Sequence, residues 1–147
     1  MSDRYNFPQI SGDSLARMAD SDDGVILFDV REPAEYRVSH IEGAIQVSPA
    51  ISAVEFMAQY AALIQDKRVV FYCSVGRRAG RLAARVEKPA AAAGARVHNL
   101  SGGIFRWHDE WRPLVDPTGK VTEQVHKFNR SVGQLMPRPG YGVLPGN

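Results

Sequence analysis

Residues 67–81 read KRVVFYCSVGRRAGR, and this stretch decides the fold. Its β-branched and aromatic run from Val69 to Tyr72 predicts a buried strand. Cys73 stands at the tip of that strand, and a tight loop containing Gly76 follows it. From Arg78 onward the alanine-rich sequence predicts a helix. A strand, a loop and a helix in this order place a thiol beside a helix N-terminus, where backbone N–H groups bind anions.

Further strands and helices alternate on both sides of this stretch. Residues 25–30 form an apolar run, interrupted only by Asp29, which is the pattern of a strand buried on both faces. Shorter strands are predicted at residues 44–47 and 95–100, and further helices at residues 52–64 and 104–111. Pro89 is expected to kink or end the helix that begins at Arg78. The alternation predicts an α/β protein whose mainly parallel sheet is flanked by helices.

Composition narrows the class of protein. The chain has 147 residues, enough for one domain with a substantial core, and a net charge of +2, too small to indicate nucleic-acid binding. Its apolar runs are too short for a membrane span and its N-terminus lacks a signal region, so a cytoplasmic protein is expected. One cysteine excludes an internal disulfide, and the four histidines lack zinc-site spacing. No metal or organic cofactor is expected.

The chain is predicted to divide into a catalytic domain at residues 1–116 and a C-terminal extension at residues 117–147. In the extension, apolar residues recur at spacings of four, three, four and three and predict an amphipathic helix. These residues are Val121, Val125, Phe128, Val132 and Leu135. Residues 136–147 are rich in proline and glycine. Two interpretations stay open: the stripe at 121–135 packs on its own domain, or it contacts a partner or the second subunit of a homodimer.

The loop after Cys73 favours a reactive thiolate, which is the nucleophilic form of cysteine. Backbone N–H groups from Ser74 to Arg78 can point inward if the loop curls, and Gly76 permits that curl. Cations at a helix N-terminus oppose the helix dipole, so Arg77 and Arg78 are expected to meet an anionic substrate there. The alternative is an inert buried cysteine. The candidate site is therefore Cys73 as nucleophile, with Ser74, Val75, Gly76, Arg77 and Arg78 as substrate-binding residues.

At this point the chain resembles the rhodanese family of sulfurtransferases, over roughly residues 9–114. The resemblance rests on four segments that occur in the family's order. They are DVREPAEY at residues 29–36, HIEGAI at residues 40–45, CSVGRR at residues 73–78, and LSGG at residues 100–103 with Trp107. It implies a rhodanese-like three-layer fold with the cysteine loop between a central strand and a helix.

The resemblance also implies a double displacement without a metal or cofactor. Cys73 would take a sulfane sulfur from thiosulfate or a similar anionic donor, become a persulfide, and pass the sulfur to a thiol, cyanide or a protein acceptor. Asp29 and Arg31 would stabilise the site residues without contacting the substrate, with a purely structural ion pair as the alternative. His40 is expected to be a hydrogen-bonded element of the fold, and Gly103 to serve backbone geometry. Trp107 would line the site or belong to the core.

Two other functions stay open. A non-metabolic sulfur-relay or regulatory module would act with a protein partner. A cysteine-dependent phosphatase would use the related loop in which five residues separate cysteine and arginine. Here four residues separate Cys73 from Arg78, and Ala79 occupies the later position. The loop length therefore favours sulfur transfer.

Overall fold

A five-stranded parallel sheet forms the centre of the molecule. The computed structural model describes residues 8–21, 24–127 and 142–143. The strands are β1 (Gln9–Ile10), β2 (Ile26–Asp29), β3 (Ile45–Gln46), β4 (Arg68–Tyr72) and β5 (Arg96–Leu100), in the spatial order β1-β5-β4-β2-β3. Every neighbouring pair in this sheet is parallel. The predicted α/β class with a mainly parallel sheet is confirmed.

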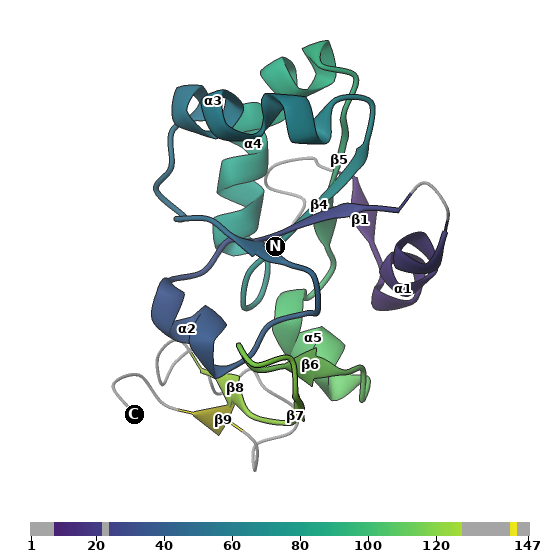
Figure 1. Ribbon diagram of the computed structural model, residues 1–147, viewed down its shortest axis with the longest axis vertical. Helices are drawn as coiled ribbons and strands as arrows, with labels where there is room; N and C mark the ends of the chain where they lie inside the picture. The colour runs from purple at the N-terminus through teal and green to yellow at the C-terminus, as the bar shows by residue number, and fades with distance from the viewer. Residues whose placement is uncertain (1–7, 22–23, 128–141, 144–147) are drawn as a thin grey trace.

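Helices cover both faces of the sheet and make three layers (Figure 1). On one face, α3 (Ala53–Ile64) and α4 (Arg77–Ala92) bury Phe56, Leu82 and Val86 against Phe28 and Phe71. On the other face lie α1 (Gly12–Asp20) and α5 (Gly103–Asp109), whose apolar side chains pack on alternate residues of the same strands. The strand residues facing α1 and α5 are Leu27, Val70, Tyr72 and Leu100. Alternate residues of β2 and β4 are thus buried on opposite faces, which explains their continuous apolar sequences.

Two details of the helices differ from the sequence prediction or extend it. The helix after the cysteine loop does not end at Pro89, because α4 runs on to Ala92. Pro89 lies in the last turn, where its missing N–H removes one hydrogen bond. A short helix, α2 (Pro33–Val38), follows β2, and the Glu35 side chain accepts a hydrogen bond from Glu32 N at its start (2.9 Å).

The C-terminal segment departs most from the prediction. Residues 121–126 form two short strands, β7 (Val121–Thr122) and β8 (Val125–His126), so the helix predicted to begin at Val121 is wrong there. β7 pairs with β6 (Leu114–Val115), and β8 pairs with β9 (Gly142–Val143). Val121 is 72% exposed and Val125 is fully buried, so the two valines do not share a helix face. The other predicted helix residues, from Phe128 on, lie outside the described ranges.

The segment after residue 116 also packs on the first part of the chain. Asp116 Oδ1 accepts hydrogen bonds from Thr118 N (2.9 Å) and Lys120 N (3.1 Å), which turns the chain back from β6 into β7. Val125 then joins the core on the α1 and α5 side of the sheet. A domain boundary at residue 116 stays a prediction. None of the helices in the described ranges is long and apolar enough to cross a membrane.

Candidate active site

Cys73 lies at the carboxyl end of β4, directly beneath the first turn of α4. Its Sγ accepts hydrogen bonds from Gly76 N at 3.1 Å and from Ala79 N at 3.4 Å. Gly76 precedes α4 with φ of +111°, a conformation that favours glycine. The predicted curl of the loop is therefore present, and backbone N–H groups converge on sulfur. These two backbone donors favour negative charge on the sulfur atom.

The carbonyl groups of the loop point the other way, toward the start of α5. Cys73 O accepts from Ile104 N (2.9 Å), and Ser74 O accepts from Phe105 N (3.1 Å). Gly103 makes this close approach possible: with φ of +61°, a Cβ atom there would lie 2.4 Å from Ser74 O. The expectation that Gly103 serves backbone geometry is confirmed. Helix α5 thus fixes the carbonyl groups of Cys73 and Ser74, the two residues at the start of the loop.

Glu35, Arg78 and Ser74 form a buried polar cluster beside the cysteine. Arg78 Nη1 and Nη2 lie 2.6 Å and 3.0 Å from the two carboxylate oxygens of Glu35. Arg78 Nη2 also donates to Ser74 Oγ at 2.8 Å, and Ser74 Oγ donates to Glu35 Oε1 at 3.3 Å. Burial alone would raise the pKa of Glu35, but the hydrogen bonds and charge of Arg78 outweigh it and hold that pKa below its usual value.

This cluster changes the interpretation of the two arginines. Arg78 was expected to face the anionic substrate, yet both of its Nη nitrogens bind the Glu35 carboxylate. Arg78 therefore braces the loop through Ser74, and Glu35 balances its charge. Arg77, at the first position of α4, is exposed, and its binding of an anionic substrate stays a prediction.

Asp29 and Arg31 are fully buried and make a bidentate ion pair behind the loop. Arg31 Nε and Nη2 donate to the two Asp29 oxygens at 2.8 Å and 2.7 Å, and Nη2 also reaches Ser39 O at 2.7 Å. Tyr72, which precedes the cysteine, donates its hydroxyl to Asp29 Oδ2 at 2.6 Å. Burial and the neighbouring Asp29 charge raise the Tyr72 pKa well above its usual value, so the phenol stays protonated as a donor. The structural role left open for this pair fits these contacts, and a supporting role for the site stays a prediction.

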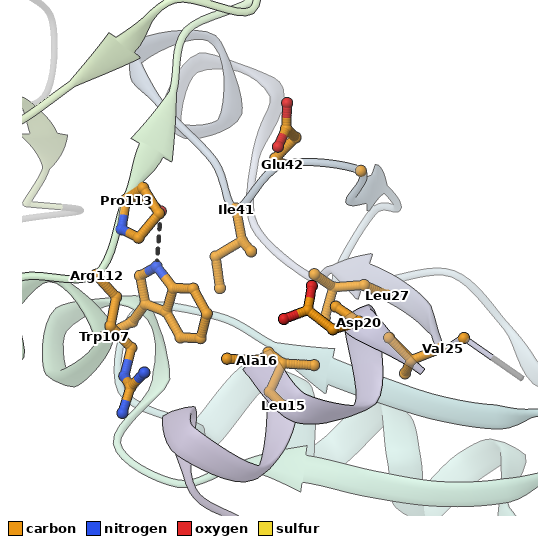
Figure 2. Close-up of a pocket in the computed structure, with 13 residues that line it drawn as sticks. Leu15, Ala16, Asp20, Val25, Leu27, Ile41, Glu42, Trp107, Arg112 and Pro113 are labelled. Carbon is orange, nitrogen blue, oxygen red and sulfur yellow. Dashed lines mark hydrogen bonds between the residues drawn. The ribbon is translucent and has the colours of Figure 1, made fainter. Parts of the chain in front are cut away.

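His40 and Trp107 lie outside the loop. His40 Nδ1 donates to Tyr36 O (3.1 Å), its ring stacks on the Tyr36 ring, and its backbone pairs with Val115, so it is the expected element of the fold. Trp107 donates its indole N–H to Pro113 O at 2.8 Å. Trp107 lines a separate pocket of about 380 Å³. Figure 2 shows its ring facing Leu15 and Asp20 of α1. Trp107 therefore belongs to the α1 and α5 side rather than to the cysteine site.

Sequence reasoning missed three residues near the loop. Glu35 appeared only within the DVREPAEY segment, although an acid three residues after Glu32 is a capping signal. Asn99, buried on β5, donates from Nδ2 to Gly76 O at 3.3 Å, and its signal is a polar residue in an apolar strand. His126, buried on β8, lies within electrostatic reach of Glu35 and Arg78. Because a helix was predicted for that segment, the sequence analysis did not indicate the position of His126.

Fold and site together define an α/β protein with a cysteine loop at the carboxyl ends of parallel strands, under a helix N-terminus. The profile of the Rhodanese-like domain family matches residues 11–110, and the chain belongs to this family. The suspected resemblance is thereby confirmed.

Curated relatives carry sulfurtransferase names. A sulfurtransferase of Allochromatium vinosum is 33% identical over 112 residues, which are 76% of this chain and 97% of that protein. The probable adenylyltransferase/sulfurtransferase MoeZ of Mycobacterium tuberculosis is 38% identical over 64% of this chain, but the match spans only 23% of that protein. The thiosulfate:glutathione sulfurtransferase of Saccharomyces cerevisiae is 34% identical over 51% of this chain and 61% of its own length. These relatives support sulfur transfer as the general activity.

Solved structures agree on the fold. The thiosulfate sulfurtransferase of Pseudomonas aeruginosa superposes with a TM-score of 0.64 and 19% identity, over 90% of this chain and 24% of that one. At this identity the similarity concerns the fold alone. It confirms the rhodanese-like three-layer architecture.

Proposed function

We propose that this protein moves a sulfane sulfur from thiosulfate, or a similar anionic donor, to a nucleophilic acceptor through a persulfide on Cys73. The observation that carries the proposal is the convergence of Gly76 N and Ala79 N on Cys73 Sγ. A persulfide places its negative charge on the outer sulfur, one bond beyond Sγ, where the remaining loop amides and the N-terminus of α4 favour it.

In the first half-reaction the Cys73 thiolate attacks the outer sulfur of the donor. A bond forms between Sγ and that sulfur, and the sulfur–sulfur bond of thiosulfate breaks. Sulfite leaves with the bonding electron pair, so no external oxidant or reductant is needed. Arg77 would attract the oxyanion end of the donor, and Arg78 would hold Ser74 and the loop in place through Glu35.

In the second half-reaction an acceptor attacks the outer sulfur of the persulfide. With cyanide the product is thiocyanate, and with a thiol it is a new persulfide. The electron pair of the broken bond returns to Cys73, which again becomes a thiolate. Both half-reactions use the same arrangement of donors around sulfur.

Intact mass spectrometry tests the proposal directly. Protein incubated with thiosulfate should gain the mass of one sulfur atom, cyanide should remove it, and Cys73→Ser should gain none. Ala79→Ser is the matched control: like Cys73→Ser it adds a hydroxyl group near the loop, but it keeps the Cys73 thiol and should still gain the sulfur. Absence of the adduct with thiosulfate, polysulfide and mercaptopyruvate would refute the proposal.

A sulfur-relay role is the second candidate, favoured by the combined adenylyltransferase/sulfurtransferase name of the M. tuberculosis relative. A relay protein protects its persulfide until a protein acceptor docks. The two roles differ in how small acceptors behave. If glutathione or cyanide removes the outer sulfur from the Cys73 persulfide as fast as the protein turns over, transfer to small acceptors is the function. If the persulfide persists in both, the relay role holds.

The phosphatase alternative receives less support. A phosphatase arginine has to face the transferred phosphate, whereas both Nη nitrogens of Arg78 bind Glu35. Turnover of p-nitrophenyl phosphate that disappears in Cys73→Ser would restore this alternative.

A further inference from the structure

A buried histidine of the C-terminal segment lies on β8, a strand that packs against α2, the helix that carries Glu35. His126 is on β8, beyond residues 11–110 that match the family profile. It is 5% exposed, and the adjacent Val125 is fully buried in the core. The position is therefore fixed by packing.

Contacts with two helices hold β8 in this place. Figure 1 shows β8 beside α2, the helix that carries Glu35. Ser39, which ends α2, donates its hydroxyl to Gln124 O at 2.6 Å. From α5, His108 Nε2 contacts Glu123 O at 2.8 Å, with the nitrogen as donor because the partner is a carbonyl. The two residues before β8 are thus anchored to α2 and to α5.

Charged groups from three elements act on His126. They are Glu35 of α2, Arg31 of the segment after β2, and Arg78 of α4. Burial lowers the pKa of His126 first, the two arginines lower it further, and Glu35 partly opposes them, so the net pKa lies below the usual value. The imidazole is therefore neutral at neutral pH. A proton on it would add a third cation around one carboxylate.

Glu35 is the shared partner in this arrangement. Its carboxylate already binds Arg78 and Ser74, and Ser74 is covalently next to Cys73. An imidazolium at His126 would attract the same carboxylate that Arg78 binds. Because Ser74 donates a hydrogen bond to Glu35, we expect a movement of Glu35 to be passed to Ser74 and from Ser74 to the loop amides around Sγ.

We propose that His126 is a positioning residue for the Cys73 loop: as a neutral imidazole it leaves Glu35 on Arg78 and Ser74, and when protonated it draws Glu35 away and slows sulfur uptake. The kinetic part of this inference rests on the proposed function. The structural part, the coupling of His126 to the Glu35–Arg78 pair, does not.

The kinetic test compares persulfide formation from thiosulfate by wild type, His126→Gln and His98→Gln across about pH 5.5 to 7.5. All three proteins keep Cys73 and its loop unchanged, so the ratio of the variant rate to the wild-type rate isolates the effect of the histidine. His98 is the matched control, because burial lowers its pKa too but its charged neighbours are Arg96 and Arg68. At the lowest pH of this range, the His126→Gln rate should exceed the wild-type rate about fivefold, a small value for coupling between two sites. At the highest pH the two rates should be equal. The His98→Gln profile should follow wild type. A His126→Gln profile that superposes on wild type overturns the proposal.

A second measurement needs no sulfur donor. In wild-type protein, NMR should show the Arg78 guanidinium signal shifting with the same midpoint as the His126 ring, and this shift should vanish in His126→Gln. If the signal follows His126 while Cys73 accepts no sulfur, the proposed function fails and the coupling stands. If the Arg78 signal does not follow His126, the positioning role is overturned. Should His126→Gln not fold, the wild-type titration alone decides.

Discussion

Glu35 and Arg78 are 43 residues apart in the chain, yet Arg78 Nη1 lies 2.6 Å from Glu35 Oε2 and Nη2 lies 3.0 Å from Oε1. This pair joins α2 to the first turn of α4, and both partners touch Ser74 Oγ. Because Ser74 follows Cys73 directly, the pair fixes one side of the cysteine loop. It is therefore both a stabilising contact and a part of the site.

Removing the charge of Glu35 should destabilise the whole fold. Glu35→Gln leaves the largely buried Arg78 without its counter-charge, and breaking one side of such a pair costs about 3–5 kcal/mol. Urea unfolding should show this loss. The control is Glu42→Gln at an exposed position, which should change the free energy of unfolding by no more than about 0.5 kcal/mol. An equal effect of both substitutions would show that the pair has no special role.

Alanine substitutions of the two neighbouring arginines should have different effects, one on substrate binding and the other on stability. Arg77→Ala removes an exposed charge at the loop mouth, so it should raise the KM for thiosulfate about two- to fivefold, equal to at most about 1 kcal/mol, and leave stability unchanged. Arg78→Ala should instead lower stability, because Glu35 and Ser74 lose their shared donor. Steady-state kinetics and urea unfolding on both variants separate these effects. A stability loss in Arg77→Ala, or none in Arg78→Ala, contradicts the assignment.

The site could be predicted from sequence where its parts are local in the chain. Cys73, the curl at Gly76 and the start of α4 lie within seven residues, so strand and helix patterns fix their arrangement. The same holds for Asp29 and Arg31, which are two residues apart. Glu35 and Asn99 reach the loop only through the packing of α2 and β5, and no local pattern records that contact.

The C-terminal segment shows a different reason for failure. Apolar spacings of four and three fit a helix, but they also fit two short strands separated by a turn. Val121 and Val125 fall on β7 and β8, and the pairing of β7 with β6 outweighs the weak helical preference of this stretch. Because the prediction put His126 on a helix, it could not place this residue on a strand that packs against α2.

Acid should destabilise the protein through two histidines. The pKa values of His98 and His126 are lowered in the folded state, chiefly by burial. The unfolded chain therefore binds more protons, so this stability is present above the ordinary histidine pKa of about 6.5 and is lost as the pH falls through the lower folded values. Urea unfolding between about pH 5 and 8 should show the decline. His98→Gln and His126→Gln should each flatten it, and an unchanged slope in both would contradict this account.

Gly103 and Gly43 offer a matched pair for the loop. Both have positive φ, +61° and +85°, so alanine at either position meets the left-handed strain of about 1–2 kcal/mol. At Gly43 the new methyl group meets nothing within 4 Å, whereas at Gly103 it would lie 2.4 Å from Ser74 O and 2.6 Å from Cys73 O. Gly43→Ala should therefore lower stability without changing the rate of persulfide formation. Gly103→Ala should lower stability further and slow sulfur uptake, because the loop carbonyls must move away from α5 and the amides around Sγ move with them. Equal rates of sulfur uptake in the two variants would show that the contact between α5 and the loop does not position Cys73.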